Sequence, residues 1–251
     1  MQNTRLAILS ALAEEQQGLI GLLRQPLRVS HAGRDFWQGD LHGQPVVLGL
    51  SKIGKVAAAT TAAVVIERFG AGAIVFTGVA GGLGAGVAVG DVVVATDFVQ
   101  HDMDASPLFS RYEVPLYGKT RFTADAALTA LLFKAAEAAL ANGRESQIFA
   151  GAQVHQGLVA SGDRFVSSAQ EADGLRIALA GAGHAVLAVE MEGAAVAQVC
   201  HDYGVAFAAV RTVSDRADDS AHLDFSRFVN QVASRYALEI IQGFVNLLPI
   251  K

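Results

Sequence analysis

The chain has 251 residues, of which 52% are hydrophobic and 17% are charged, a composition that predicts a large apolar core and excludes a disordered chain. The net charge is -5 and no run of Lys or Arg occurs, so the sequence lacks the basic surface that nucleic acids require. The single cysteine, Cys200, excludes an intrachain disulfide framework and favours a reducing compartment. No Pro/Ser-rich or charged linker divides the chain. We therefore expect a cytoplasmic protein in which residues 1–251 form one domain.

Two apolar segments could be taken for membrane or secretory signals. Residues 6–13 have the character of a signal-peptide core, but their basic region is the single Arg5 and an amphipathic pattern follows. Residues 70–95 contain many glycines and Asp91, which do not suit a membrane helix. We therefore expect no membrane partner.

Apolar runs and helical periodicities alternate along the chain. In chain order they predict a strand at 4–10, a helix at 13–23, a hairpin of strands 35–41 and 45–50, a segment 51–70 that opens with a glycine turn and becomes a long helix, strands at 73–79 and 92–99, a helix at 124–141, a strand region at 147–161, a helix at 168–180, a strand at 186–189, a helix from 193 through 203, a strand at 205–213 and a closing helix at 225–248. This order predicts an α/β fold with a largely parallel or mixed sheet covered on both faces.

Two irregular segments could bind a ligand. The glycine-rich residues 78–91 follow a strand but lack the Gly-Lys-Ser/Thr ending of a phosphate-binding loop, and a strand follows them, which disfavours nucleotide phosphate binding. Residues 101–121 form the longest irregular stretch, and long loops in compact domains tend to be functional or interfacial. His101, Asp102 and Asp104 lie there without a second histidine at ligand spacing, so we expect no metal.

Acidic side chains follow several of the predicted strands. Glu15, Glu192 and Asp215 each lie just past a strand, and the carboxyl ends of parallel strands meet on one side of a sheet. Three converging carboxyl groups suit hydrolysis of a glycosidic bond, with one group as base and another as acid. Each acid could instead cap a helix or lie on the surface, and a glutamate of the pair Glu190 and Glu192 could pair with a core arginine.

Other residues near these strand ends could complete a nucleoside site. Phe165 follows the turn Gly162-Asp163 and could stack on a base ring, while a sugar diol needs an acceptor such as Glu192. Arg211 interrupts an apolar strand, so it should be paired or face a ligand.

Seven ordered motifs extend the pattern over nearly the whole chain: LAEEQQ at 12–17, SKIGKVAAA at 51–59, GVAGGL at 78–83, VGDVV at 89–93, SGDRFV at 161–166, VEMEGAAVA at 189–197 and VRTVSDRAD at 210–218. Together they resemble the bacterial 5′-methylthioadenosine/S-adenosylhomocysteine nucleosidases. The resemblance implies a three-layer α/β/α sandwich with a central mixed sheet, of the nucleoside phosphorylase/hydrolase type. It also implies a homodimer, an adenine nucleoside substrate, and no metal or cofactor.

The resemblance also implies a role for each site residue. Glu15 would activate the water, Asp215 would protonate N7 of adenine, and Arg211 and Ser214 would support the water and the acid. The substrate would be bound by the remaining site residues: Glu192 at the ribose hydroxyls, Met191 beneath the sugar, Phe165 stacked on adenine, the Val166 backbone at the adenine edge, and Ile53 and Phe225 around the 5′-alkylthio group. Val79 would lie beside the catalytic water, where familiar members have a small hydroxyl residue.

Three alternatives share much of this pattern. A related phosphorylase would need cationic groups for phosphate, and only Arg211 is available near Glu15 and Val79. A futalosine-type hydrolase would differ mainly on the 5′ side, where the 102–117 loop, which in the family reaches the partner's 5′ pocket, differs from the enterobacterial form. A catalytically silent nucleoside-binding protein is the third alternative, and the joint presence of Glu15, Glu192 and Asp215 argues against it.

Overall fold

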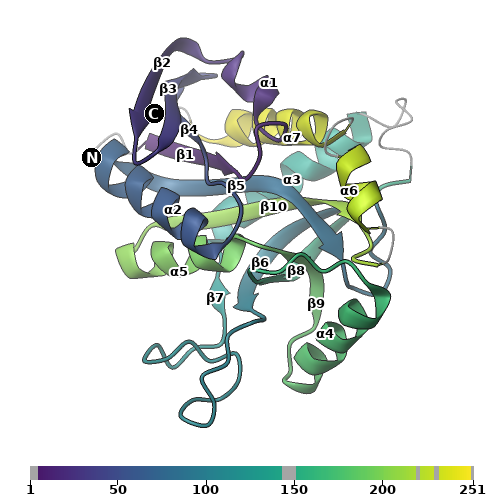
Figure 1. The fold of residues 1–251 in the computed structure, drawn as a ribbon. Coiled ribbons are helices and arrows are strands. Elements are labelled where there is room, and N and C mark those ends of the chain that lie inside the picture. The colour runs from purple at the N-terminus through teal and green to yellow at the C-terminus, as the bar shows by residue number, and fades with distance from the viewer. Residues whose placement is uncertain (1–4, 143–150, 219–220, 229–231, 250–251) are drawn as a thin grey trace.

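The computed structural model describes residues 5–142, 151–218, 221–228 and 232–249 (Figure 1). The strands are β1 (Arg5–Ser10), β2 (Arg24–His31), β3 (Arg34–Leu41), β4 (Gln44–Leu50), β5 (Ala71–Gly82), β6 (Val92–Gln100), β7 (Phe122–Thr123), β8 (Val154–Ser161), β9 (Val186–Glu190) and β10 (Ala206–Asp215). The helices are α1 (Gln17–Ile20), α2 (Lys55–Phe69), α3 (Ala126–Asn142), α4 (Ala169–Gly181), α5 (Gly193–Tyr203), α6 (Ala221–Phe228) and α7 (Ser234–Leu247).

The strands form one mixed sheet. β5 lies at its centre and pairs in parallel with β1 and β10, while β4 pairs in parallel with the other edge of β1. β10 continues antiparallel to β6, which is followed by the parallel strands β8 and β9. β9 returns to β5 through two antiparallel pairs, Gly81 with Val189 and Gly82 with Ala188. The path β5–β10–β6–β8–β9 is therefore a closed ring, and β4, β3 and β2 extend the sheet beyond it.

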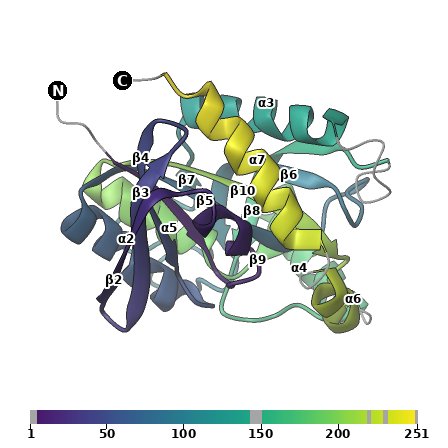
Figure 2. The same cartoon turned by 90° about the horizontal axis from the view of Figure 1, so that it is seen from above.

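Helices cover both faces of the sheet, which gives the three-layer α/β/α arrangement with a central mixed sheet that the sequence predicted. In Figure 1 α2 and α5 lie on one side of β5 and β10, and α3 and α7 lie on the other. The small residues of α2 and α5 pack with Phe76 and Phe207 in one core cluster. The second cluster joins Leu132 of α3 with Ile240 and Phe244 of α7, and Figure 2 shows these two helices across the top of the sheet.

Several predicted elements are wrong in extent. The predicted helix 13–23 is reduced to the four residues of α1, which contains Gly18 and is followed by Gly21, and the strand β2 after it was not predicted. The predicted helix 225–248 is replaced by α6 and α7, which point in different directions in Figure 2. The predicted strand region 147–161 shortens to β8, and its residues 147–150 lie outside the described residues. Asp215, predicted just beyond its strand, is the last residue of β10. By contrast, the helix predicted after the glycine turn of residues 51–70 is confirmed, because α2 begins at Lys55, directly after Gly54.

Within the described ranges, none of the helices is both long enough and apolar enough to cross a membrane.

Candidate functional site

A cavity of about 340 Å³ lies where the carboxyl ends of β1, β5, β9 and β10 meet. Its lining residues are Ala11, Leu12, Glu15, Ile53, Val79, Ala80, Gly81, Phe165, Glu190, Met191, Glu192, Ser214, Asp215 and Phe225. The cavity therefore brings together every predicted site residue except Arg211 and Val166. Arg211 is buried next to it in β10, and Val166 is buried on the other side of Phe165, where it lines a separate cavity of about 310 Å³.

Glu15 is a buried carboxylate held by backbone N–H groups. Its Oε2 accepts bonds from the Ala11 and Leu12 N–H groups, each at 2.8 Å, and its Oε1 accepts one from Val79 N–H at 3.1 Å. The first two bonds turn the chain sharply after β1, so Glu15 precedes α1 instead of lying in a first helical turn. Burial raises the pKa of Glu15 above its ordinary value, although these bonds and the charge of Arg211 oppose the shift.

Asp215 and Ser214 form a hydrogen-bonded pair at the end of β10. The Ser214 hydroxyl donates to Asp215 Oδ2 at 2.8 Å, and the Ala217 N–H donates to Asp215 Oδ1 at 2.8 Å. Both side chains are buried and both line the cavity. The Asp215 carboxyl group is thus fixed in orientation beside the cavity.

Glu190 and Arg211 form a buried ion pair. The Arg211 Nη2 donates to Glu190 Oε2 at 2.7 Å, and the Arg211 guanidinium also lies over the Phe76 ring, with Cζ 4.2 Å from the ring centroid. The Glu190 carboxylate accepts bonds from the Gly193 N–H at 2.9 Å, from the Glu192 N–H at 3.1 Å and from the Ser161 hydroxyl. Glu190 therefore joins a core arginine to the start of α5. Pairing of one of the two glutamates with a core arginine was an alternative that the sequence left open.

Among the described residues, the Glu192 side chain accepts one backbone hydrogen bond, from the Gly54 N–H to Oε1 at 2.9 Å. Burial and the neighbouring charge of Glu190 raise the pKa of Glu192, and Arg211 opposes the rise. Of the two glutamates in the motif, Glu192 is thus the one whose carboxyl oxygens can accept further hydrogen bonds from a ligand in the cavity.

The other wall of the cavity is apolar. The rings of Phe165 and Phe225 meet edge to face with centroids 5.6 Å apart, and Ile53 lies on the α2 side. Phe165 and Ile53 are 39% and 54% exposed, so this wall has large apolar surfaces that a ligand could cover.

Two glycines of the GVAGGL segment make room for the acids, which the sequence analysis did not foresee. A Cβ on Gly78 would lie 3.0 Å from Glu15 Oε1, and a Cβ on Gly81 would lie 3.0 Å from Asp215 Oδ1. The spacing of these glycines in the GVAGGL segment at the end of β5 is the sequence signal for this close approach. Ser161 is a further residue that the sequence did not predict, and its hydroxyl links Glu190 to the Ala194 N–H at 2.8 Å.

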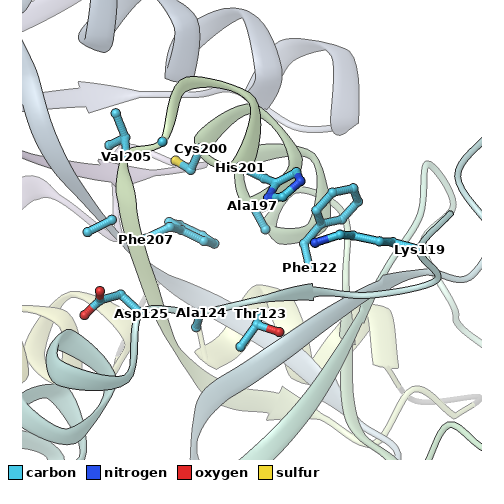
Figure 3. Close-up of a pocket in the computed structure, with 12 residues that line it drawn as sticks. Lys119, Phe122, Thr123, Ala124, Asp125, Ala197, Cys200, His201, Val205 and Phe207 are labelled. Carbon is cyan, nitrogen blue, oxygen red and sulfur yellow. The ribbon is translucent and has the colours of Figure 1, made fainter. Parts of the chain in front are cut away.

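A different cavity, of about 390 Å³, lies at the amino end of β10 (Figure 3). It is lined by parts of α5 and β7 and by Lys119, Asp125 and His201. None of the predicted site residues lies there. In the part of the chain that the structure describes, no group of three or more His, Cys, Asp or Glu side chains is placed to hold a metal ion.

The chain matches known proteins over almost its full length. Residues 5–246 match the family model described as the phosphorylase superfamily. A 5′-methylthioadenosine/S-adenosylhomocysteine nucleosidase of Actinobacillus succinogenes is 35% identical over 243 residues, which cover 96% of this chain and 98% of that protein. The chain belongs to this nucleosidase family.

Solved structures of the family agree with this assignment. The Neisseria meningitidis nucleosidase in complex with methylthio-immucillin-A has a TM-score of 0.87 and 36% identity, covering 98% of this chain and 100% of that chain. The Colwellia psychrerythraea nucleosidase in complex with adenine has a TM-score of 0.88 and 31% identity, covering 100% of this chain and 98% of that chain. The fold is therefore that of the nucleoside phosphorylases and hydrolases.

The buried Glu190–Arg211 pair predicts a strongly non-additive effect on stability. Arg211→Met leaves a buried carboxylate without its cation and should cost about 3–5 kcal/mol of the free energy of unfolding. The double variant Glu190→Gln/Arg211→Met should be more stable than the sum of the two single changes by about 1–3 kcal/mol. Urea unfolding of the four proteins measures both quantities, and additive effects would contradict an energetically coupled pair.

Proposed function

We propose that this chain hydrolyses the N-glycosidic bond of 5′-methylthioadenosine, S-adenosylhomocysteine and related 5′-deoxyadenosines, releasing adenine and a 5-thioribose-type sugar. The observation that carries the proposal is the convergence of Glu15, Glu192 and Asp215 on one cavity that also has an apolar aromatic wall. The membership of the chain in the nucleosidase family supports it.

In this mechanism Glu15 is the general base that activates water. A carboxylate with a raised pKa is a stronger base than an ordinary glutamate, and burial supplies that rise here. The bonds from Ala11, Leu12 and Val79 keep both oxygens in fixed positions while Glu15 takes the proton. Arg211 acts indirectly in this proposal, through its charge on Glu15 and its pairing with Glu190.

Asp215 is the general acid, and it protonates N7 of adenine as the glycosidic bond breaks. The proton converts a poor anionic leaving group into neutral adenine. Ser214 supports this step because its hydroxyl, which bonds Asp215 Oδ2, fixes the carboxyl group and can reorient as the proton leaves.

The remaining residues bind the substrate. Glu192 accepts hydrogen bonds from the ribose hydroxyls, Met191 and Val79 lie beside the sugar, and Phe165 stacks on adenine while the Val166 backbone bonds its edge. Ile53 and Phe225 surround the 5′-alkylthio group, and their apolar surfaces suit a thioether.

Hydrolysis is favoured over phosphorolysis by the charge of the cavity. Its described lining includes the acids Glu15, Glu190, Glu192 and Asp215 and contains no Lys, Arg or His. Inorganic phosphate would meet carboxylates there without a cation in direct contact. Water is the nucleophile that this lining tolerates.

A homodimer and a role in methionine salvage are further parts of the proposal. The loop between β6 and β7 has two large apolar side chains on its surface, Leu108 at 84% exposed and Leu116 at 91% exposed. A second copy of the chain that covers these side chains would explain their presence on the surface. Release of adenine from methylthioadenosine would return both halves of that nucleoside to metabolism in the cytoplasm.

A product assay tests the reaction. The protein is incubated with methylthioadenosine, S-adenosylhomocysteine, 5′-deoxyadenosine and aminofutalosine, each with and without phosphate, and the sugar product is identified. We expect adenine and a free sugar from the first three, at rates that do not depend on phosphate. A phosphorylated sugar would assign the chain to the phosphorylases, preference for aminofutalosine would change the substrate, and tight binding without adenine release would indicate a silent binder.

Asp215→Asn should slow adenine release by at least about a hundredfold, the usual contribution of a general acid. The fold should persist, because an Asn oxygen can accept the Ala217 N–H and its amide can donate to the Ser214 hydroxyl, which has the Ala80 carbonyl at 3.4 Å as an acceptor. Single-turnover kinetics and thermal unfolding measure the two effects. A rate of adenine release within a few-fold of the wild-type rate would show that Asp215 is not the general acid.

The raised pKa of Glu15 predicts the acid limb of the pH profile. Glu15 must be ionised to act as a base, so kcat/KM should fall as the pH drops through a midpoint above 4.5, the ordinary value for glutamate. Glu15→Gln should abolish activity at every pH, whereas Glu14→Gln should leave the pH midpoint of the fall in kcat/KM unchanged. Full kcat/KM at pH 4.5 would be incompatible with Glu15 as the base.

A further inference from the structure

We propose that Asp102 is a positioning residue for the nucleosidase reaction, because it joins the segment that carries Phe165 to the start of α2 beside Glu192. The group formed by Lys55, Asp102 and Asp163 is called the clasp below. The inference rests on the proposed function for its kinetic consequences, whereas the clasp itself can be tested without turnover. None of its three residues lines the cavity.

The clasp joins three segments that are far apart in the sequence. Asp102 Oδ1 accepts a bond from the Lys55 ammonium at 2.6 Å, and Asp102 Oδ2 accepts one from the Asp163 N–H at 2.9 Å. The Asp163 carboxylate in turn accepts a bond from the Lys55 N–H at 2.7 Å. Two of the three bonds use backbone N–H groups, so they fix the path of the chain as well as the side chains.

Each end of the clasp is one or two residues from the cavity. Phe165 follows Asp163 by two residues, and Gly54, which precedes Lys55, donates its N–H to Glu192 Oε1 at 2.9 Å. Gly54 has φ +99°, and a Cβ there would lie 3.1 Å from Asp163 Oδ1. The glycine thus permits the close approach of the Asp163 carboxylate to the start of α2.

Lys55 is itself held in place from a second direction. Its ammonium also donates to Gln100 Oε1 at 3.0 Å, and Gln100 donates to Gln198 Oε1 of α5 at 2.8 Å. The Lys55 side chain is only 16% exposed and that of Asp102 is 32% exposed. The clasp is therefore partly shielded from solvent and anchored to the helix that begins after Glu192.

The electrostatics agree with a carboxylate that works as an ion. Burial alone would raise the pKa of Asp102, but the Lys55 ammonium and the Asp163 N–H outweigh it and the pKa lies below its ordinary value. His101, also buried, has its pKa lowered mainly by burial and does not replace Lys55 as the cation. The Asp102 side chain is thus charged in the folded protein at neutral pH, and Asp102→Asn would remove that charge.

The consequence for the reaction is a selective effect on substrate binding. Phe165 and Glu192 contact the base and the sugar in the proposed complex. The Glu15 and Asp215 carboxyl groups accept bonds from Ala11 and Ser214, which are not part of the clasp. Loosening the clasp should misplace the binding groups and leave the base and the acid unchanged. The expected signature is a change in KM that is larger than the change in kcat.

The kinetic test compares Asp102→Asn with Asp35→Asn. Asp35 lies on β3 and is paired with Arg28 at 2.5 Å, so it is an ion-paired aspartate outside the clasp, the cavity and the 102–117 loop. Asp102→Asn should raise KM for methylthioadenosine about tenfold, as expected for a lost charge-assisted bond, and lower kcat less than about threefold. Asp35→Asn should leave both constants unchanged. Equal effects of the two variants, or a loss confined to kcat, would overturn the proposal.

A second variant covers the case in which Asp102→Asn folds poorly. Lys55→Met removes the cation but keeps the Asp163 N–H bond to Asp102, so its KM increase should be smaller. In the double variant the KM increase should be less than the product of the two separate increases, because both changes break the same bond. Independent effects that multiply would show that the two residues do not act as one group.

Amide hydrogen exchange tests the clasp without any substrate. In Asp102→Asn the N–H groups of Asp163 and Lys55 should exchange at least about tenfold faster than in the wild-type protein. The amides of β5 and β10 should stay as protected from exchange as in the wild type. Unchanged exchange at both amides would overturn the clasp. Faster exchange in a protein that cleaves none of the nucleosides would reject the proposed function and leave the clasp standing.

Discussion

The buried pair of Glu190 and Arg211 is the interaction on which the site depends. β9 pairs with β8 up to Glu190, but on its other edge it pairs with β5 through two residue pairs that do not include Glu190. The 2.7 Å ion pair adds a strong link from that end to β10, and the bonds from Gly193 and Glu192 to the same carboxylate fix the start of α5. Either charge alone in this position would be costly, which ties the two strands together as one unit.

The four carboxyl groups of the cavity are distinguished by their partners. Glu190 has a guanidinium, Glu15 has three backbone N–H groups, Asp215 has a hydroxyl and an N–H, and Glu192 has one backbone bond. Burial raises the pKa of Glu15 and Glu192 because it disfavours the ionised form of both carboxyl groups. A sugar that develops positive charge would relieve this cost, and the relief would be larger in the transition state than in the bound substrate.

Local patterns predicted the layers of the fold and the convergence of Glu15, Glu192 and Asp215, which the structure places around one cavity. The hydrophobic runs give the strands, and parallel pairing of β1, β5 and β10 brings Glu15, Val79 and Asp215 to one side. The closed ring of strands could not be predicted, since it depends on pairings such as Gly81 with Val189 between distant segments. The exposed strand β2 contains Pro26 and has only Leu27 and Val29 as alternating apolar residues, a pattern too short to predict a strand.

The roles of individual residues depended on the same distant pairings. The residue pattern alone does not distinguish Glu190 from Glu192, and the resemblance assigned the ribose to Glu192. The position of Arg211 on β10 shows that Glu190 is the glutamate that pairs with the core arginine. The glycines in the second half of β5 had the opposite outcome. Their segment was considered as a place where a ligand approaches the backbone, whereas in the structure Gly78 and Gly81 leave room for the carboxyl groups of Glu15 and Asp215. Small residues on the central strand therefore serve the acids of the neighbouring segments, and any side chain at these positions would displace the groups that give the cavity its chemistry.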